Sequence, residues 1–240
     1  MTKAPPQISF GHSREFWDCY PSFLQNLIVG NGATEVCDIG GGANPMLDLG
    51  FLRAHHIGCT VLDIAQGELD KAPPEYAKIA ADIASPAFEI HDRFDFAFSK
   101  MLAEHVRDAE QFHRNVRQML APGGIAFHFF PTLYAFPFFV NRILPERGSS
   151  GLLGLFSPRD KVKHAKFPAY YDWCRGPSER MIRNYERIGF EVLQYRGFFG
   201  HEYYRRLPPF DALQKRFEDY LVKKPVPFFA TYACVVLKKA

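Results

Sequence analysis

The sequence lacks a long uninterrupted apolar run. Its most apolar window, residues 125–144, is broken by five polar or proline residues: His128, Pro131, Pro137, Asn141 and Arg142. A helix that crosses a membrane needs about 20 predominantly apolar residues, so we expect no membrane span. The first ten residues hold two prolines and no apolar core, so we expect no signal peptide either.

An excess of charge of one sign is also missing, and cysteine is scarce. There are 29 Lys and Arg residues against 26 Asp and Glu, which gives a net charge of +3. This balance provides no strong footprint for nucleic acid, and we expect no such partner.

The five cysteines are widely spaced and form no C-x-x-C pair. They argue against a disulfide framework or a zinc knuckle and predict a reducing, cytoplasmic location.

What is present fits an ordinary globular protein. Hydrophobic residues make up 47% of the 240 residues and charged residues 23%, which is typical of a chain that buries a sizeable core. We expect a single domain over residues 1–240. Residues 1–9 are expected to form a loose tail in front of it.

The most informative stretch is residues 35–45, where an apolar run ends in Asp38 and three glycines follow at positions 40–42. This pattern predicts a buried parallel strand that enters a tight turn and then a helix. Glycine permits backbone angles closed to other residues and lets a ligand approach the main chain. An acid at the end of such a strand lies where ligands bind in open α/β sheets. The alternative is an ordinary glycine-rich turn.

The spacing of these residues shows which of the known nucleotide-binding loop motifs the stretch can match. The dinucleotide fingerprint G-x-G-x-x-G/A fails at Pro45, and the Gly-Lys-Ser/Thr of a P-loop is absent. Residues 38–44 instead resemble motif I (D/E-x-G-x-G-x-G) of the class I S-adenosylmethionine (SAM) methyltransferases, with Asn44 in place of the last glycine. The resemblance implies that SAM is bound, at its methionine end, by Asp38, Gly40, Gly41, Gly42 and Ala43.

Two further strand ends fit the same family. The second predicted strand, residues 58–63, ends in Asp63, which can accept hydrogen bonds from both ribose hydroxyls. A helix cap or a solvated loop acid is the alternative for this residue. The resemblance adds Ile64 to the cofactor site and places Asp82 and Ile83, after a short strand at 76–81, at the adenine. A simple turn role for Asp82 stays open.

The fourth predicted strand, residues 93–99, leads into Ala103-Glu104-His105-Val106. This resembles motif IV of the small-molecule branch of the family, which often reads Leu-Glu-His-Val. The resemblance also places Ser99 and Lys100, at the strand end, beside the cofactor.

His105 is the predicted catalytic residue, because histidine can act as a general base near neutral pH. His128 and His201 are weaker candidates for that role. A histidine that only fixes the loop is the alternative. Some relatives bind a metal through Glu-x-x-Glu-His, but Met101 stands at the first Glu position here, so we expect no metal.

Later segments complete the family pattern. Leu-Ala-Pro-Gly-Gly at 120–124 precedes a fifth apolar strand, and a helix capped by Ser178 and stopped by Gly189 precedes Phe-Glu-Val. We therefore expect a three-layer, Rossmann-like α/β fold. Its sheet is expected to be seven-stranded and mostly parallel, with an antiparallel last strand.

Two segments are expected to cover the site. Residues 10–30 show a helical spacing of apolar residues, broken at Pro21, and resemble a leading helix that lies across the cofactor as a lid. A helix that only packs on the core is the alternative. The insertion at 131–176 is rich in aromatic and basic residues and is expected to cover the acceptor site. It can equally be a packed insert or a dimer interface, so a homodimer stays open.

The resemblance implies a SAM-dependent methyltransferase that acts on an O, N or C atom of a small-molecule acceptor, of aromatic or anionic character. Two alternatives remain. One is a SAM-binding regulatory or interaction protein without transferase activity. The other is an NAD(P)-dependent oxidoreductase, against which the broken fingerprint and the absence of Tyr-x-x-x-Lys both argue.

Overall fold

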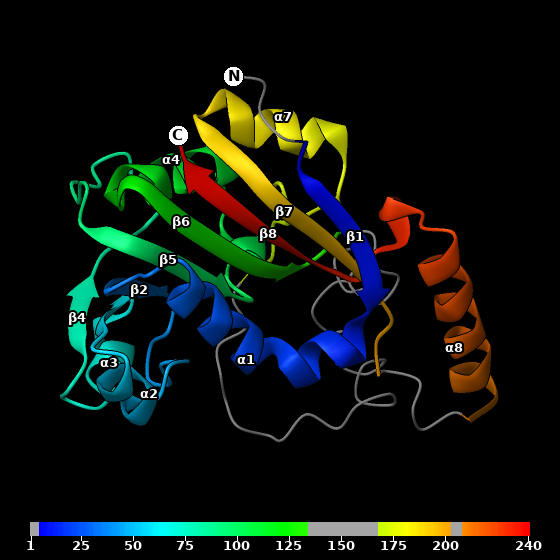
Figure 1. Cartoon of the computed structure of the whole chain (residues 1–240), viewed down its shortest axis with the longest axis horizontal. Coiled ribbons are helices and arrows are strands. Elements are labelled where there is room, and N and C mark those ends of the chain that lie inside the picture. The colour runs from blue at the N-terminus through cyan, green and yellow to red at the C-terminus, as the bar shows by residue number, and fades with distance from the viewer. Residues whose placement is uncertain (1–4, 134–167, 203–207) are drawn as a thin grey trace.

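A computed structural model describes residues 5–133, 168–202 and 208–240 (Figure 1). Its strands are β1 (Gln7–His12), β2 (Glu35–Ile39), β3 (Gly58–Asp63), β4 (Ala77–Ala80), β5 (Phe94–Lys100), β6 (Leu120–Pro131), β7 (Phe190–Phe199) and β8 (Tyr232–Lys239). Its α-helices are α1 (Ser13–Gly30), α2 (Leu49–Ala54), α3 (Gln66–Leu69), α4 (Ala109–Met119), α7 (Glu179–Arg187) and α8 (Pro208–Lys223). Two short 3₁₀ helices complete the set, η1 (Ala103–His105) and η2 (Pro227–Phe229).

All eight strands form one sheet in the order β1-β7-β8-β6-β5-β2-β3-β4. Neighbours are parallel except where β8 pairs with β6 and β7, so β8 is the antiparallel strand of the described sheet. The α/β class, the mostly parallel sheet and the antiparallel last strand are confirmed. The expected strand number of seven is corrected to eight.

The additional strand is β1, and the prediction of a loose tail over residues 1–9 is wrong for residues 7–9. Gln7 pairs with Gln194 and His12 with Phe199, in parallel register with β7. The ring of Phe10 stacks on Phe199 at 5.7 Å. β1 therefore lies at the edge of the sheet, where β7 offers it a ladder of backbone hydrogen bonds.

Helices cover both faces of the sheet, which makes the three layers that were expected. In Figure 1, α4 and α7 lie on one side of the sheet, and α1, α2 and α3 on the other. Helices α1, α4 and α7 each bury one apolar stripe. Helix α4, for example, begins after Asp108, whose carboxylate accepts from the amide of Gln111, and buries Phe112, Val116 and Met119. α7 begins after Ser178, whose hydroxyl accepts from the amide of Met181, and ends before Gly189 at φ 90°.

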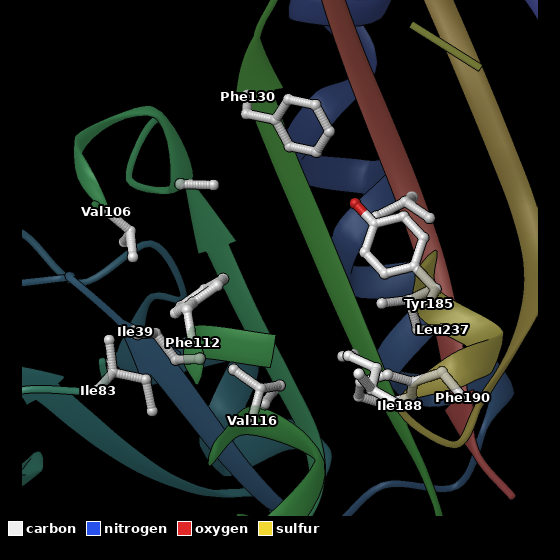
Figure 2. Packing of buried hydrophobic residues seen from close by; sticks show 14 of the residues in the cluster. Ile39, Ile83, Val106, Phe112, Val116, Phe130, Tyr185, Ile188, Phe190 and Leu237 are labelled. Atoms are coloured by element: carbon white, nitrogen blue, oxygen red, sulfur yellow. The ribbon is translucent and has the colours of Figure 1, made fainter. Parts of the chain in front are cut away.

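The core on the α4 and α7 side is continuous (Figure 2). Phe112 and Val116 of α4 lie beside Ile39 of β2, while Ile188 lies beside Phe190 of β7. Each of these side chains is at most 5% exposed. This packing fixes the strand ends that carry the site, because a close-packed interior resists displacement.

On the other face, α1 is one continuous helix that passes through Pro21 without dividing. Phe16 packs against the rings of Phe129 and Phe198, and Tyr20 packs against the ring of Phe127. Most of the insertion predicted at 131–176 lies outside the described residues. No helix in the described part of the chain is long and apolar enough to cross a membrane.

Candidate active site

The glycine-rich turn begins at the carboxyl end of β2 and closes around Asp38. The carboxylate is 2% exposed and accepts a hydrogen bond from the amide of Met46 at 2.8 Å. Burial raises the pKa of Asp38 to about 7, against the lowering effect of this hydrogen bond. Gly40 adopts φ 78°, and its amide donates to the carbonyl of Leu62 in β3 at 2.7 Å. The predicted strand, turn and acid are therefore in place.

The three glycines leave no room for side chains, because each turns toward another part of the site. A Cβ on Gly40 would lie 2.8 Å from Leu102, which follows β5. One on Gly41 would lie 2.8 Å from the carboxylate of Asp38, and one on Gly42 would lie 3.2 Å from Asp63 Oδ2. The loop thus brings together the carboxyl ends of β2, β3 and β5, and the main chain is exposed at Gly40, where no Cβ hinders a ligand.

Asp63 ends β3 with one oxygen engaged and one directed at the glycine loop. Its Oδ1 accepts from the amide of Ala65 at 2.9 Å, while Oδ2 faces Gly42. The next residue, Ile64, is 66% exposed. This open apolar side chain follows directly on Asp63, and its place in the cofactor site stays a prediction.

Asp82 and Ile83, predicted at the adenine, lie in the turn that follows β4. Asp82 is exposed, and its Oδ1 accepts from the amide of Ala84 at 2.9 Å. Ile83 is 7% exposed and packs into the core near Phe112. The carbonyl of Ile83 accepts from the side chain of Asn115 at 2.8 Å, which anchors this turn to α4.

Lys100, at the end of β5, connects the strand end to the covering helix α1. Its ammonium lies 4.7 Å from the ring centroid of Tyr20 and 5.0 Å from that of Trp17. It also lies 3.8 Å from the sulfur of Met46. Burial lowers the pKa of Lys100, and the carboxylate of Asp38 opposes the shift. These cation–π contacts fix α1 to the end of β5, while its role as a lid stays a prediction.

Ser99, the neighbour of Lys100, points to the opposite face of the sheet. It is fully buried, and its hydroxyl lies 2.8 Å from Nδ1 of His128 on β6. The ring of His128 lies 5.0 Å from that of His113 on α4. Burial lowers the pKa of His128 to about 3, so this imidazole stays neutral. The structure thus places the Ser99 and His128 side chains in the core, where only the main chain of Ser99 remains for a ligand at the strand end.

His105 lies in η1, just beyond the end of β5. Its Nδ1 lies 3.0 Å from the carbonyl of Pro168, which can only accept, so Nδ1 carries the proton and Nε2 the lone pair of the neutral ring. Nε2 lies 3.7 Å from Oε1 of Glu104. Glu104 is 4% exposed, and burial raises its pKa to about 8. Sequence reasoning quoted Glu104 as part of a motif but assigned it no role.

A pocket of about 510 Å³ opens beside the amino-terminal end of α1. It is lined by Ser13, Arg14, Trp17, Asp18, His201, Glu202 and Tyr232. Trp17 connects it to Lys100, since the same indole contacts both. Burial lowers the pKa of His201 to about 4. Arg14 and Tyr232 carry no motif in the sequence; only their places, on the predicted lid and at the start of the last strand, could have indicated them.

The chain was compared with known proteins. Residues 37–128, which contain the glycine loop, Asp63, Lys100 and His105, match the methyltransferase domain family. No curated protein matches the sequence.

Many solved structures share the fold. An S-adenosylmethionine-dependent methyltransferase from Clostridium acetobutylicum superposes with a TM-score of 0.56 at 12% identity, over 92% of this chain and 91% of that one. A SAM-dependent methyltransferase from Archaeoglobus fulgidus gives 0.54 at 13%, over 95% and 100%. Phosphoethanolamine N-methyltransferase 2 from Haemonchus contortus, solved with S-adenosyl-L-methionine, gives 0.53 at 13%, over 90% and 52%. At these identities the likeness establishes the fold.

Proposed function

We propose that this protein, whose residues 37–128 match the methyltransferase domain family, transfers the methyl group of SAM to an O, N or C atom of a small-molecule acceptor. The observation that carries the proposal is the glycine loop. Gly41 and Gly42 approach Asp38 and Asp63 so closely that a Cβ would crowd both carboxylates. The loop therefore holds its main chain between two carboxylates, with Gly40 exposed at its start, which fits a ligand with an amino acid end and a ribose.

Different residues of this chain would bind different parts of the cofactor. Asp38 and the main chain of the loop would hold the charged methionine end, since a buried carboxylate favours a cation beside it. Oδ2 of Asp63 would accept from the ribose, because Oδ1 is already engaged by Ala65. The open side chain of Ile64 would cover the adenine. Bound in this way, SAM supplies an electrophilic methyl group on a positively charged sulfur.

His105 is the proposed base. The carbonyl of Pro168 keeps the proton on Nδ1, so Nε2 can take a proton from the acceptor. Glu104 lies 3.7 Å from Nε2 and is held near neutrality by burial. Oε1 of the neutral Glu104 would then accept from the Nε2–H of the imidazolium that forms. The pair thus retains the proton at His105 without a bulk water contact to Glu104.

The acceptor would enter the pocket beside Trp17. Two aromatic rings, Trp17 and Tyr232, and the guanidinium of Arg14 line it. Flat apolar walls suit a small molecule with an aromatic part, while Arg14 is matched by the lining carboxylates of Asp18 and Glu202. Lys100, which shares Trp17 with the pocket, adds a second positive charge at the strand end.

The test is calorimetric titration of SAM and of S-adenosylhomocysteine into the full-length protein, with the variant Asp63→Asn alongside. Asparagine keeps the shape and the acceptor oxygen for Ala65 but loses the charge. We expect it to weaken binding by about 1–3 kcal/mol, the range for a hydrogen bond to a charged group. Transfer of labelled methyl to aromatic and carboxylate acceptors is then measured with the same protein.

The matched control is Asp92→Asn, the same change at an exposed aspartate just before β5, at the opposite end of the sheet. It should bind SAM like the unmodified protein. Failure of the folded protein to bind either ligand refutes the proposal and directs the search to NAD(H). Binding that never leads to transfer supports a regulatory SAM-binding protein instead.

A further inference from the structure

The helix α8 carries an apolar stripe that the rest of the described chain does not cover. Phe210, Leu213, Phe217 and Tyr220 recur at a spacing of three and four residues, so they lie along one line of the helix. Their exposed fractions are 60%, 66%, 48% and 53%. Large apolar side chains exposed together in this way mark an interaction surface.

This stripe is not the side by which α8 is attached. The helix packs through Leu221, which is 3% exposed, and through Glu218, whose carboxylate fills the space beside Gly200. Gln214 donates to the carbonyl of His201 at 2.8 Å. Positions 214, 218 and 221 form the neighbouring line on the helix, so the stripe lies beside the attached side and remains open to solvent. In Figure 1, α8 stands at the edge of the molecule beside β1.

The short helix η2 extends the apolar surface. The ring of Phe229 lies 5.8 Å from that of Phe217 and is 44% exposed. Val226, just before η2, is 40% exposed. We define the α8–η2 face as Phe210, Leu213, Phe217, Tyr220, Val226 and Phe229.

Three exposed cations lie around this face, together with the exposed carboxylate of Asp219. Arg216, Lys223 and Lys224 are exposed, and no carboxylate of the described residues lies within 4.0 Å of them. The acids of α8 are engaged: Asp211 pairs with Lys215, and Asp219 with His12. Arg216 and Lys223 lie on the helix next to the line of Tyr220 and Leu213, so they border the apolar face.

We infer that the α8–η2 face docks on an anionic lipid surface. An amphipathic helix with Phe and Leu on one side and Lys and Arg along the border is the arrangement that lies in a membrane interface. The aromatic side chains enter the acyl boundary while the three cations meet the headgroups. A second copy of this chain fits less well, because a two-fold contact centred on this face would bring Arg216 and Lys223 against their own counterparts.

The test is sedimentation of the full-length protein with phosphatidylcholine vesicles that contain phosphatidylserine, compared with vesicles of phosphatidylcholine alone. We expect binding to the anionic vesicles, which salt weakens. The double variant Arg216→Glu with Lys223→Glu should lower the partition coefficient by at least about 25-fold, since each basic residue contributes about fivefold. Phe217→Ser with Phe229→Ser should lower it at least about tenfold.

Matched controls lie on other faces of the molecule. Val29→Ser removes an apolar side chain that is 44% exposed at the end of α1, and Arg53→Glu reverses an exposed charge in α2. Both should bind vesicles unchanged. The inference is overturned if the unmodified protein ignores anionic vesicles, or if the two double variants bind as well as it does. It is also overturned if Phe217→Ser with Phe229→Ser instead separates a dimer that does not bind vesicles.

Discussion

Glu104 provides the sharpest test of the site electrostatics. Its side chain is buried in η1, and Oε2 has no hydrogen-bond partner among the described residues. Burial raises its pKa from the ordinary 4.5 to about 8. In the folded protein the group therefore keeps its proton at a pH where the unfolded chain has already released it.

The sign and size of the effect follow from this difference. An acid whose pKa is raised by folding contributes stability that is fully present below its unfolded pKa and is lost as the pH rises through its folded pKa. Between pH 5 and pH 7.5, Glu104 should therefore remove about 3 kcal/mol from the free energy of unfolding. Glutamine has the same shape and does not titrate, so Glu104→Gln should abolish this loss.

The assay is urea unfolding of both proteins at pH 5 and at pH 7.5. We expect similar stabilities at pH 5 and a variant that is about 3 kcal/mol more stable at pH 7.5. Glu89→Gln, a change at an exposed carboxylate, should follow the unmodified protein at both values. Equal pH dependences for Glu104→Gln and the unmodified protein would show that Glu104 is ionised in the fold, and would remove the argument for its partnership with His105.

Three other predictions concern the loop and the core. Gly41→Ala should weaken SAM binding at least about tenfold in calorimetry, because its Cβ would displace Asp38, whereas Gly67→Ala, with nothing within 4 Å, should not. SAM affinity should fall as the pH drops below about 7, where Asp38 gains a proton, and Asp38→Asn should make the affinity independent of pH in that range. Burial lowers the pKa of His128 to about 3, so this group contributes stability that is present above pH 6.5 and lost on acidification. Between pH 7.5 and pH 5, the free energy of unfolding of His128→Gln should therefore fall by about 2 kcal/mol less than that of the unmodified protein, as measured by urea unfolding.

The sequence was most informative where local pattern and topology coincide. Asp38 and Asp63 could be placed at neighbouring strand ends because an apolar run that ends in an acid is a local signal, and parallel strands bring such ends to one edge. The mostly parallel sheet with its antiparallel last strand followed from the family pattern. Both aspartates do border the glycine loop in the structure.

The strand β1 could not be predicted because its pattern is too weak by itself. Only Ile8 and Phe10 alternate with polar or small residues, and the partner stretch of β7 contains Gln194 and Gly197, which also weaken a strand pattern. The pairing exists because each segment supplies the backbone partners of the other. A sequence pattern that is read one segment at a time cannot detect this pairing.

The side chains of the site were harder to orient than to locate. Ser99 and Lys100 are neighbours at a strand end, and alternation sends one to each face of the sheet. Which face of the sheet holds α1 depends on the tertiary arrangement. The sequence therefore could not show that the side chain of Ser99 points toward His128, 29 residues away. The contact of Lys100 with Trp17 and Tyr20 likewise joins segments that no local pattern connects.

The direct junction between β1 and α1 restricts how a ligand can enter. β1 ends at His12, α1 begins at Ser13 with its hydroxyl bonded to the carbonyl of Gly200, and only residues 31–34 separate the far end of α1 from β2. A helix that is fixed at both ends cannot rotate away from the sheet about one end. Displacing α1 requires β1 to separate from β7 at the edge of the sheet. If α1 covers the cofactor as the resemblance implies, amide exchange in β1 and ligand release should therefore share one opening event.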